Sequence, residues 1–270
     1  MLESNLTEKH FVIDDLIDIT LKAGDTAMAI YARDHDVAIK QDNSPVTEAD
    51  LAVDNLLFPV LCELYPDIPI VTEERAATHG ATPQSGRFFL VDPIDGTKEF
   101  IKKTGEFTIN IALVENGTPI AGIVYAPAIG RMFVGDASSG AREIDPAGTA
   151  RKIAVRTCGE DMTAIASRSH LTKETEDFIS QNKISDCVNA GSSLKFCLVA
   201  AGEADIYPRF GPTMEWDTGA GHAVLLAAGG QVLTCDGSPL SYGKTQFRNP
   251  YFIAASPTAH YSIPTTVLAI

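Results

Sequence analysis

A buried strand that ends in acidic residues constrains this chain more than any other feature. The segment 87–91 (Arg-Phe-Phe-Leu-Val), which predicts a buried strand, leads directly into Asp92-Pro93-Ile94-Asp95-Gly96-Thr97. Carboxylates three residues apart at a strand end can converge on one point, because the proline stiffens the turn and the glycine allows tight backbone geometry after it. The Ile94 carbonyl and the Thr97 hydroxyl add further oxygens, and hard divalent cations prefer such ligands. The spacing also fits an ordinary turn, since Asp-Pro and Asp-Gly both favour turns.

Two other acidic segments fit the same chemistry. Glu73 follows an apolar run, 68–71, that predicts a strand. Adjacent strand residues point to opposite sides, so only one of Glu73 and Glu74 can face a shared site, and we select Glu73; an isolated Glu-Glu pair is otherwise a solvated surface feature. Asp50 lies in the first turn of a helix predicted from Thr47, where both residues fit a capping box. Asp50 can combine this role with binding a metal through water or accepting a proton.

A fourth acidic segment lies far along the chain, at 215–222 (Glu-Trp-Asp-Thr-Gly-Ala-Gly-His). It predicts a helix start, where Asp217 is by default a capping acid. The small residues after it allow the helix to approach another element closely, so Asp217 is also a candidate ligand from the second half of the chain.

Few cationic side chains are placed to hold a phosphate. Ser192-Ser193-Leu194-Lys195 marks a helix start, where free backbone N–H groups favour anions, and 167–170 (Ser-Arg-Ser-His) marks a strand-to-helix turn. The candidate cations are Lys40, Lys98, Arg168, Lys195 and Arg209. Any one of them alone is weak support, because most Lys and Arg side chains are simply solvated.

The order of predicted elements divides the chain. Helices predicted over 8–32 and Thr47–Tyr65 precede strands that form an antiparallel sheet, with a hairpin at Asn116-Gly117. The polar stretch 137–149 is the expected domain junction, and strands alternate with helices after it. We therefore expect an α+β N-terminal domain over 1–145, which holds most metal ligands, and an α/β C-terminal domain over 146–270, which holds substrate-binding residues and Asp217.

Composition narrows the function classes. A net charge of −14 argues against binding a nucleic acid polymer, and bound divalent cations would reconcile this charge with a phosphate substrate. The 5 cysteines are widely spaced without a C-x-x-C pair, which favours a reducing, cytoplasmic setting. No apolar run approaches the roughly 20 residues of a transmembrane helix, and the N-terminus lacks the order of a secretory signal.

Together these motifs resemble the inositol monophosphatase superfamily, whose signature is Asp-Pro-Ile/Leu-Asp-Gly-Thr with a distant Trp-Asp pair. Within it, the sequence is most similar to the bacterial 3′(2′),5′-bisphosphate nucleotidases of the CysQ type, over nearly the whole chain. The segments that carry this resemblance are 92–101, 105–108, 191–197 and 207–213.

The resemblance implies a layered αβαβα sandwich and a Mg²⁺-dependent phosphomonoester hydrolase with two or three Mg²⁺ ions. It implies hydrolysis of adenosine 3′,5′-bisphosphate to AMP and phosphate, a role in sulfur metabolism, and inhibition by lithium. The implied metal ligands are Glu73, Asp92, the Ile94 carbonyl, Asp95 and Asp217, with Asp50 acting through water. Asp50 and Thr97 are the implied catalytic pair. The implied substrate-binding residues are Gly96, Thr97, Lys98, His170, Ser192, Lys195 and Arg209.

Alternatives stay open at this point. The metal motif also fits an inositol or sugar monophosphatase, and phosphoadenylyl sulfate is a further possible substrate. A non-enzymatic metal-binding protein is disfavoured by Thr97, a hydroxyl that metal storage does not need. The sequence leaves open whether the protein is a monomer or a homodimer, and whether it associates peripherally with the inner face of a membrane.

Overall fold

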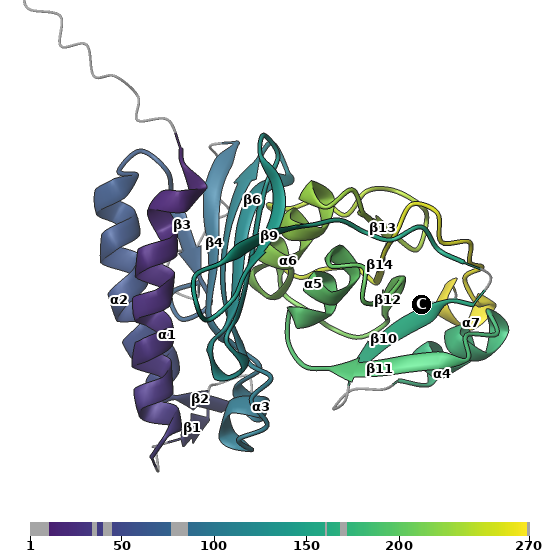
Figure 1. Ribbon diagram of the computed structural model, residues 1–270, viewed down its shortest axis with the longest axis horizontal. Coiled ribbons are helices and arrows are strands. Elements are labelled where there is room, and N and C mark those ends of the chain that lie inside the picture. The colour runs from purple at the N-terminus through teal and green to yellow at the C-terminus, as the bar shows by residue number, and fades with distance from the viewer. Residues whose placement is uncertain are drawn as a thin grey trace, which may run out of the picture.

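The computed structural model describes residues 11–33, 37–39, 45–76, 86–159, 161–167 and 172–268. Within these ranges, helices and sheets alternate in layers (Figure 1). The pair α1 and α2 covers one face of a seven-stranded sheet, α5 and α6 lie between this sheet and a five-stranded one, and α4 and α7 lie beyond. The predicted αβαβα sandwich is confirmed.

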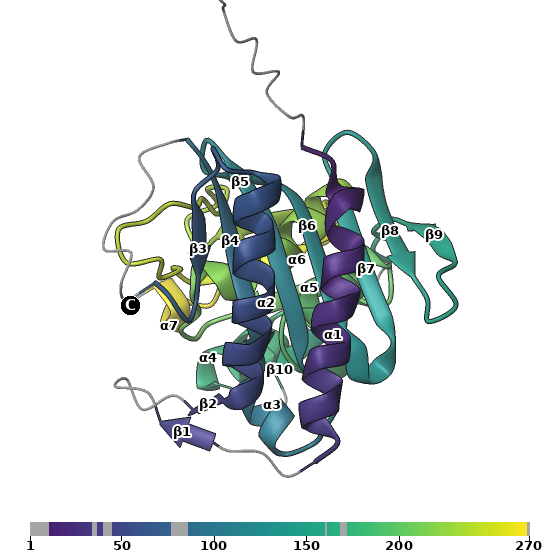
Figure 2. The ribbon, with the colours of Figure 1, turned by 90° about the vertical axis from the view of Figure 1, so that its left-hand side faces the viewer.

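The first helical layer lies across the large sheet, as Figure 2 shows. It consists of a short 3₁₀ turn, η1 (Ile13–Leu16), followed by α1 (Ile17–Tyr31) and α2 (Glu48–Leu64). Between the helices, β1 (Val37–Ile39) and β2 (Pro45–Thr47) form a small antiparallel pair. The predicted capping box is confirmed: Thr47 caps α2, and the Asp50 carboxylate accepts a hydrogen bond from the Thr47 backbone N–H at 2.7 Å.

The large sheet carries the acidic motif. Its strands lie in chain order, and all neighbours are antiparallel except the parallel pair β3–β4. The predicted hairpin at Asn116-Gly117 joins β5 to β6, with both turn residues at positive φ. The strands are β3 (Ile70–Thr72), β4 (Arg87–Asp95), β5 (Thr108–Glu115), β6 (Thr118–Ala126), β7 (Arg131–Asp136), β8 (Gly140–Ile144) and β9 (Ala150–Ile153), with α3 (Thr97–Ile101) after β4 and η2 (Pro127–Ile129) after β6.

The predicted domain junction, 137–149, contains a strand that the sequence did not predict. β8 lies inside this stretch and pairs with β7 and β9, so the large sheet continues to Ile153, past residue 145. These strands are held in part by charge rather than by an apolar pattern, because Glu143 on β8 pairs with Arg131 on β7 and Arg151 on β9. An ion-paired edge gives a weak hydrophobic periodicity, which explains why the sequence did not predict it.

The second sheet is mixed. β10, β11 and β12 are parallel, as the strand–helix alternation predicted, but β14 is antiparallel to both of its neighbours, β12 and β13. The elements are β10 (Thr163–Ser167), α4 (Lys173–Gln181), β11 (Asp186–Ala190), α5 (Leu194–Ala200), β12 (Ile206–Arg209), α6 (Glu215–Ala227), β13 (Gln231–Thr234), β14 (Phe252–Ala255) and α7 (Thr265–Leu268). The sequence did not predict β14.

The two halves share one hydrophobic core, which contains residues of the large sheet such as Leu90 together with Phe196 of α5 and Val224 of α6. Helix α6 approaches the sheet closely at two glycines. A Cβ at Gly122 would lie 2.5 Å from the Ala220 carbonyl oxygen, and one at Gly135 would lie 2.4 Å from the Val224 Cα. This close packing brings the start of α6 to the end of β4. In the described part of the chain, no helix has the length and apolar character to cross a bilayer.

Candidate metal and phosphate site

A bulge at the end of β4 presents the paired aspartates. The register of β4 against β5 shifts between Asp92 and Asp95. The Asp92 carboxylate, which is 1% exposed, accepts a hydrogen bond from the Ile94 backbone N–H at 3.1 Å. Gly96 follows at φ 90°, a left-handed conformation that favours glycine, and α3 begins at Thr97. The local sequence thus turns the strand end into a small platform of oxygen atoms.

The predicted catalytic pair is in contact. The Thr97 hydroxyl lies 3.4 Å from Asp50 Oδ1 and 3.4 Å from the Ile94 carbonyl oxygen. The other carboxylate oxygen of Asp50 accepts from both the backbone N–H and the hydroxyl of Thr47. The helix cap therefore orients Asp50 toward the β4 bulge.

The acidic side chains from separate segments lie close enough to repel one another. Burial raises the pKa of Asp92 well above its ordinary value, and the charges of Glu73, Asp95, Asp217 and Asp50 raise it further. Burial also raises the pKa of Asp217, followed by the charge of Asp95, while a hydrogen bond from the Met214 backbone N–H lowers it. The structure thus brings the charges of four other predicted acids close enough to Asp92 to affect its pKa.

Their chemistry fits a divalent cation. Buried carboxylates that raise one another's pKa need a positive charge nearby to stay ionised, and oxygen donors suit Mg²⁺. In the described ranges, no three His, Cys, Asp or Glu side chains are already arranged to hold one ion. Carbonyl and water oxygens would therefore supply part of the ligand set of an ion at this site.

Asp95 lies where acidic and basic groups meet. Burial raises its pKa to about 6, the Lys195 ammonium and a hydrogen bond from the Ser193 backbone N–H lower it, and Glu99 and Glu73 raise it. Its carboxylate also accepts a hydrogen bond from Asn110 at 3.4 Å.

Lys195 is the buried cation of the site. It is 5% exposed, and its ammonium donates to the backbone carbonyls of Ser192 at 2.6 Å and Ala190 at 3.4 Å. Burial lowers its pKa to about 8, and the charge of Asp95 counteracts this shift. The ammonium also lies 5.5 Å from the centre of the Tyr207 ring.

Arg209 is the second cation near the acids. Its guanidinium donates to the Pro212 carbonyl at 2.8 Å, and its charge lowers the pKa of Asp217. Its buried Nε has no hydrogen-bond partner among the described residues. Arg209 thus has one N–H donor close to Asp217 that could bind a ligand.

The other predicted substrate-binding residues occupy varied surroundings. The Ser192 hydroxyl lies between the backbone carbonyls of Asp95, at 2.7 Å, and Glu106, at 2.8 Å. A Cβ at Gly96 would lie 2.1 Å from this hydroxyl. Lys98 is exposed on the first turn of α3. His170, Lys40 and Arg168 lie outside the described residues.

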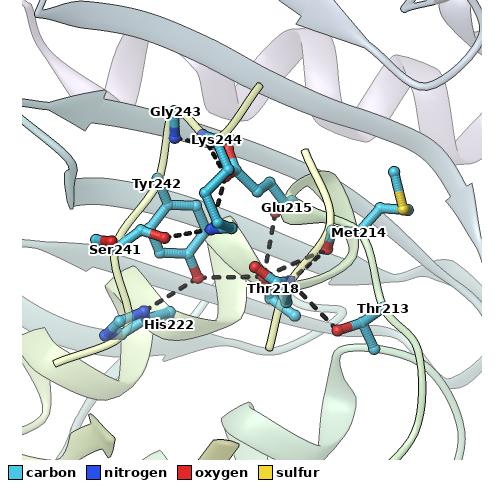
Figure 3. Close-up of polar contacts among 10 residues, drawn as sticks. Thr213, Met214, Glu215, Thr218, His222, Ser241, Tyr242, Gly243 and Lys244 are labelled. Carbon is cyan, nitrogen blue, oxygen red and sulfur yellow. Dashed lines mark hydrogen bonds and ion pairs between the residues drawn. The ribbon is translucent and has the colours of Figure 1, made fainter. Parts of the chain in front are cut away.

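A buried polar network anchors the first turns of α6, which carries Asp217 (Figure 3). Glu215, fully buried, accepts from the backbone N–H groups of Gly243 and Lys244 and pairs with the Lys244 ammonium at 2.7 Å. The Tyr242 hydroxyl donates to Thr218 at 3.1 Å and lies 3.0 Å from His222 Nδ1. The position of Asp217 is therefore set by contacts with a loop 24 to 29 residues farther along the chain.

Sequence reasoning did not predict the contacts among three buried polar residues beside Asp95, namely Thr108, Asn110 and Ser193. The Ser193 hydroxyl donates to Asn110 Oδ1 at 2.7 Å and lies 2.9 Å from the Thr108 hydroxyl. The available signal was the polar alternation Thr108-Ile109-Asn110 at the start of the otherwise apolar strand β5.

Comparison with known proteins identifies the family of this chain. The model of the inositol monophosphatase family matches residues 9–264. The 3′(2′),5′-bisphosphate nucleotidase CysQ of Escherichia coli O157:H7 is 45% identical over 244 residues, which cover 89% of this chain and 98% of that protein. The same-named protein of Buchnera aphidicola is 39% identical over 250 residues, covering 91% of this chain and 94% of the relative.

Solved structures give the same result. CysQ from Bacteroides thetaiotaomicron, described as a bacterial member of the inositol monophosphatase family, superimposes with a TM-score of 0.77 at 38% identity, covering 92% of this chain and 97% of that one. The IMPase of Thermotoga maritima superimposes with a TM-score of 0.76 at 26% identity, covering 95% and 94%. The matches in sequence and in structure both extend over nearly the whole chain, which therefore belongs to the inositol monophosphatase family.

Proposed function

We propose that this chain is a Mg²⁺-dependent phosphomonoester hydrolase that acts on 3′(2′),5′-bisphosphate nucleotides and converts adenosine 3′,5′-bisphosphate to AMP and phosphate. The observation that carries the proposal is the cluster of mutually repelling acids around Asp92, with Lys195 and Arg209 beside it. The named activity of relatives up to 45% identical supports this substrate class.

Glu73, Asp92, the Ile94 carbonyl, Asp95 and Asp217 would hold two or three Mg²⁺ ions, with Asp50 acting through water. When bound, the ions supply positive charge for the phosphoryl oxygens and lower the pKa of water. The protein contributes the geometry, since phosphoryl transfer depends mainly on positioning and charge stabilisation.

Asp50 and Thr97 would activate the attacking water. The Thr97 hydroxyl is oriented to donate to Asp50 Oδ1, so its own lone pair can accept a hydrogen from water. A proton leaving the water can then reach Asp50 Oδ1 through Thr97 Oγ1, and Thr47 holds the Asp50 carboxylate in place.

The cations on the other side of the acids would recognise the rest of the nucleotide. Arg209 has a buried Nε that can donate to a second phosphate, and Lys195 adds charge close to Asp95. Gly96, Lys98, Ser192 and His170 complete the proposed substrate-binding set. The acids repel a phosphate, and a second phosphate that pairs with the cationic side chains offsets this repulsion. The site therefore favours a bisphosphate over a simple sugar phosphate.

The test is a phosphate-release assay on adenosine 3′,5′-bisphosphate, phosphoadenylyl sulfate and inositol 1-phosphate, with Mg²⁺, with EDTA and with added Li⁺. We expect the highest kcat/KM for the adenosine bisphosphate, loss of activity with EDTA, and inhibition by Li⁺. A higher kcat/KM for inositol 1-phosphate would assign an inositol monophosphatase instead. Absence of release from every substrate would favour the non-enzymatic alternative.

The proposal places the enzyme in the cytoplasm, where it would remove a by-product of sulfur metabolism. The predicted division at residue 145 would assign most metal ligands to the first half, and substrate-binding residues together with Asp217 to the second. Light scattering of the purified protein would decide between monomer and homodimer, and sedimentation with vesicles would detect peripheral membrane binding.

A further inference from the structure

Asn110 connects the acidic site to the second half of the chain. It lies on β5 directly opposite Asp92, and its side chain is 1% exposed. Its amide nitrogen donates to Asp95 Oδ2 at 3.4 Å, while its amide oxygen accepts from the Ser193 hydroxyl at 2.7 Å. Both ends of the amide are therefore engaged.

The Ser193 contact determines which way the amide faces. An asparagine amide has one accepting and one donating end, so a hydroxyl that donates to the oxygen leaves the NH₂ group for Asp95. Ser193 and Thr108 are 1% and 0% exposed, so water does not reach these groups and losing a contact leaves a buried polar atom unsatisfied. The chain Thr108–Ser193–Asn110–Asp95 is thus a buried polar network with a single favourable orientation.

The turn that carries Ser193 also packs against the segment around Asp95. The Ser192 hydroxyl donates to the Asp95 carbonyl at 2.7 Å. At Gly191, an added Cβ would lie 2.6 Å from the Glu106 carbonyl oxygen, so this turn and the loop before β5 are in close backbone contact. The orientation of Asp95 therefore depends on a turn of the second half.

We propose that Asn110 is a positioning residue for Asp95, and that Ser193 sets the amide so that packing of the second half aims the Asp95 carboxylate at the metal site. The inference rests on the proposed function, in which Asp95 is a metal ligand. Groups that orient metal-binding side chains typically contribute 10–100-fold to metal affinity.

The test measures binding of Mn²⁺ alone to the full-length protein, without substrate, by electron paramagnetic resonance of the free ion. The variants are Asn110→Ala, Ser193→Ala and the double variant. Thr20→Ala is the matched control, because Thr20 on α1 is 0% exposed and donates to the carbonyl of Leu16, the last residue of η1. Thermal melts of each variant identify any that fail to fold.

We expect Asn110→Ala to weaken Mn²⁺ binding about 10-fold or more, Ser193→Ala to weaken it less, and Thr20→Ala to leave it unchanged. The double variant should bind as weakly as Asn110→Ala alone, because Ser193 acts through Asn110. Wild-type affinity in folded Asn110→Ala, or additive losses in the double variant, would overturn the inference and leave the metal site intact. If Asn110→Ala does not fold, wild-type affinity in Ser193→Ala overturns it. If the wild-type protein does not bind Mn²⁺, the proposed function and the inference both fail.

Discussion

Some neighbours of Asp95 oppose ionisation of its carboxyl group, and others favour it. Burial, Glu99 and Glu73 raise its pKa, whereas Lys195 and the Ser193 backbone N–H lower it. With a pKa of about 6, the side chain is mostly ionised at neutral pH and ready to bind a cation. Because opposing effects set its pKa, Asp95 is a sensitive residue for testing the site.

The substitution Asp95→Asn should reduce kcat at saturating Mg²⁺ by more than about 100-fold, since even groups that merely orient metal ligands are worth 10–100-fold. The melting temperature without Mg²⁺ should not fall, because the change removes a buried charge that neighbouring acids repel. Steady-state kinetics and a thermal melt check both points. Unchanged turnover in folded protein would rule out Asp95 as a ligand.

Lys195 should make substrate binding depend on pH. Its pKa is lowered to about 8, so the ammonium is charged below this value and neutral above it. The KM for the bisphosphate should therefore rise several-fold between about pH 7 and pH 9. Lys195→Ala should raise KM more than it lowers kcat and should lose this pH dependence. A pure kcat defect would argue that Lys195 does not hold the substrate.

At the scale of elements, helix α6 joins the two halves of the protein. It contacts the large sheet at Gly122 and Gly135, and its first turns are anchored by Glu215, Tyr242 and Lys244. Asp217 lies between these two sets of contacts, so its position follows from helix packing together with the hydrogen bond that its carboxylate accepts from the Met214 backbone N–H.

Gly122→Ala should therefore separate α6 from the sheet. The added methyl would lie 2.5 Å from a backbone oxygen of α6 that cannot rotate away. We expect a loss of roughly 1–3 kcal/mol in the free energy of unfolding, measured in urea, together with weaker metal binding. Gly159→Ala is the matched control, because a Cβ there has no atom within 4 Å and the residue is exposed. Equal effects of both substitutions would contradict this role for α6.

At the scale of the molecule, the acidic site should oppose folding at neutral pH until cations bind. Asp95, with its pKa raised from 3.8 to about 6, stays protonated in the folded protein between these values while the unfolded chain has lost the proton. The contribution of Asp95 to the free energy of unfolding is therefore highest at low pH, and it falls as pH rises from about 4 to 6. Asp92 and Asp217 shift in the same direction.

Thermal melts from pH 4 to pH 7 at constant ionic strength test this effect. Without Mg²⁺, the Tm of the wild-type protein should fall relative to that of Asp95→Asn as pH rises. Added Mg²⁺ should raise the wild-type Tm more at pH 7 than at pH 4, since ions compete with protons for the same carboxylates. A Mg²⁺ effect that is independent of pH would contradict a carboxylate site.

Local features were predictable from the sequence because a few adjacent residues determine them. The Thr47–Asp50 capping box and the Asn116-Gly117 hairpin appear as predicted. Strand β4 does not end at Val91 as predicted, because it continues through a bulge to Asp95. The choice of acids also came from the sequence, through the placement of each at a strand or helix end and through the family resemblance.

Only the tertiary structure decided which distant groups meet. Strand β14 pairs with β12, whose residues lie more than 40 positions earlier in the chain. Strands β8 and β9 pair with their neighbours in the chain, but their own residues give little apolar alternation. Asn110 bonds to Ser193, 83 residues away, and Thr97 contacts Asp50 across 47 residues. The sequence by itself determined the turns, caps and chemical groups, because these depend on neighbouring residues; the tertiary structure decided how they combine into one site, because packing of α6 and of the 191–193 turn depends on contacts that no local pattern records.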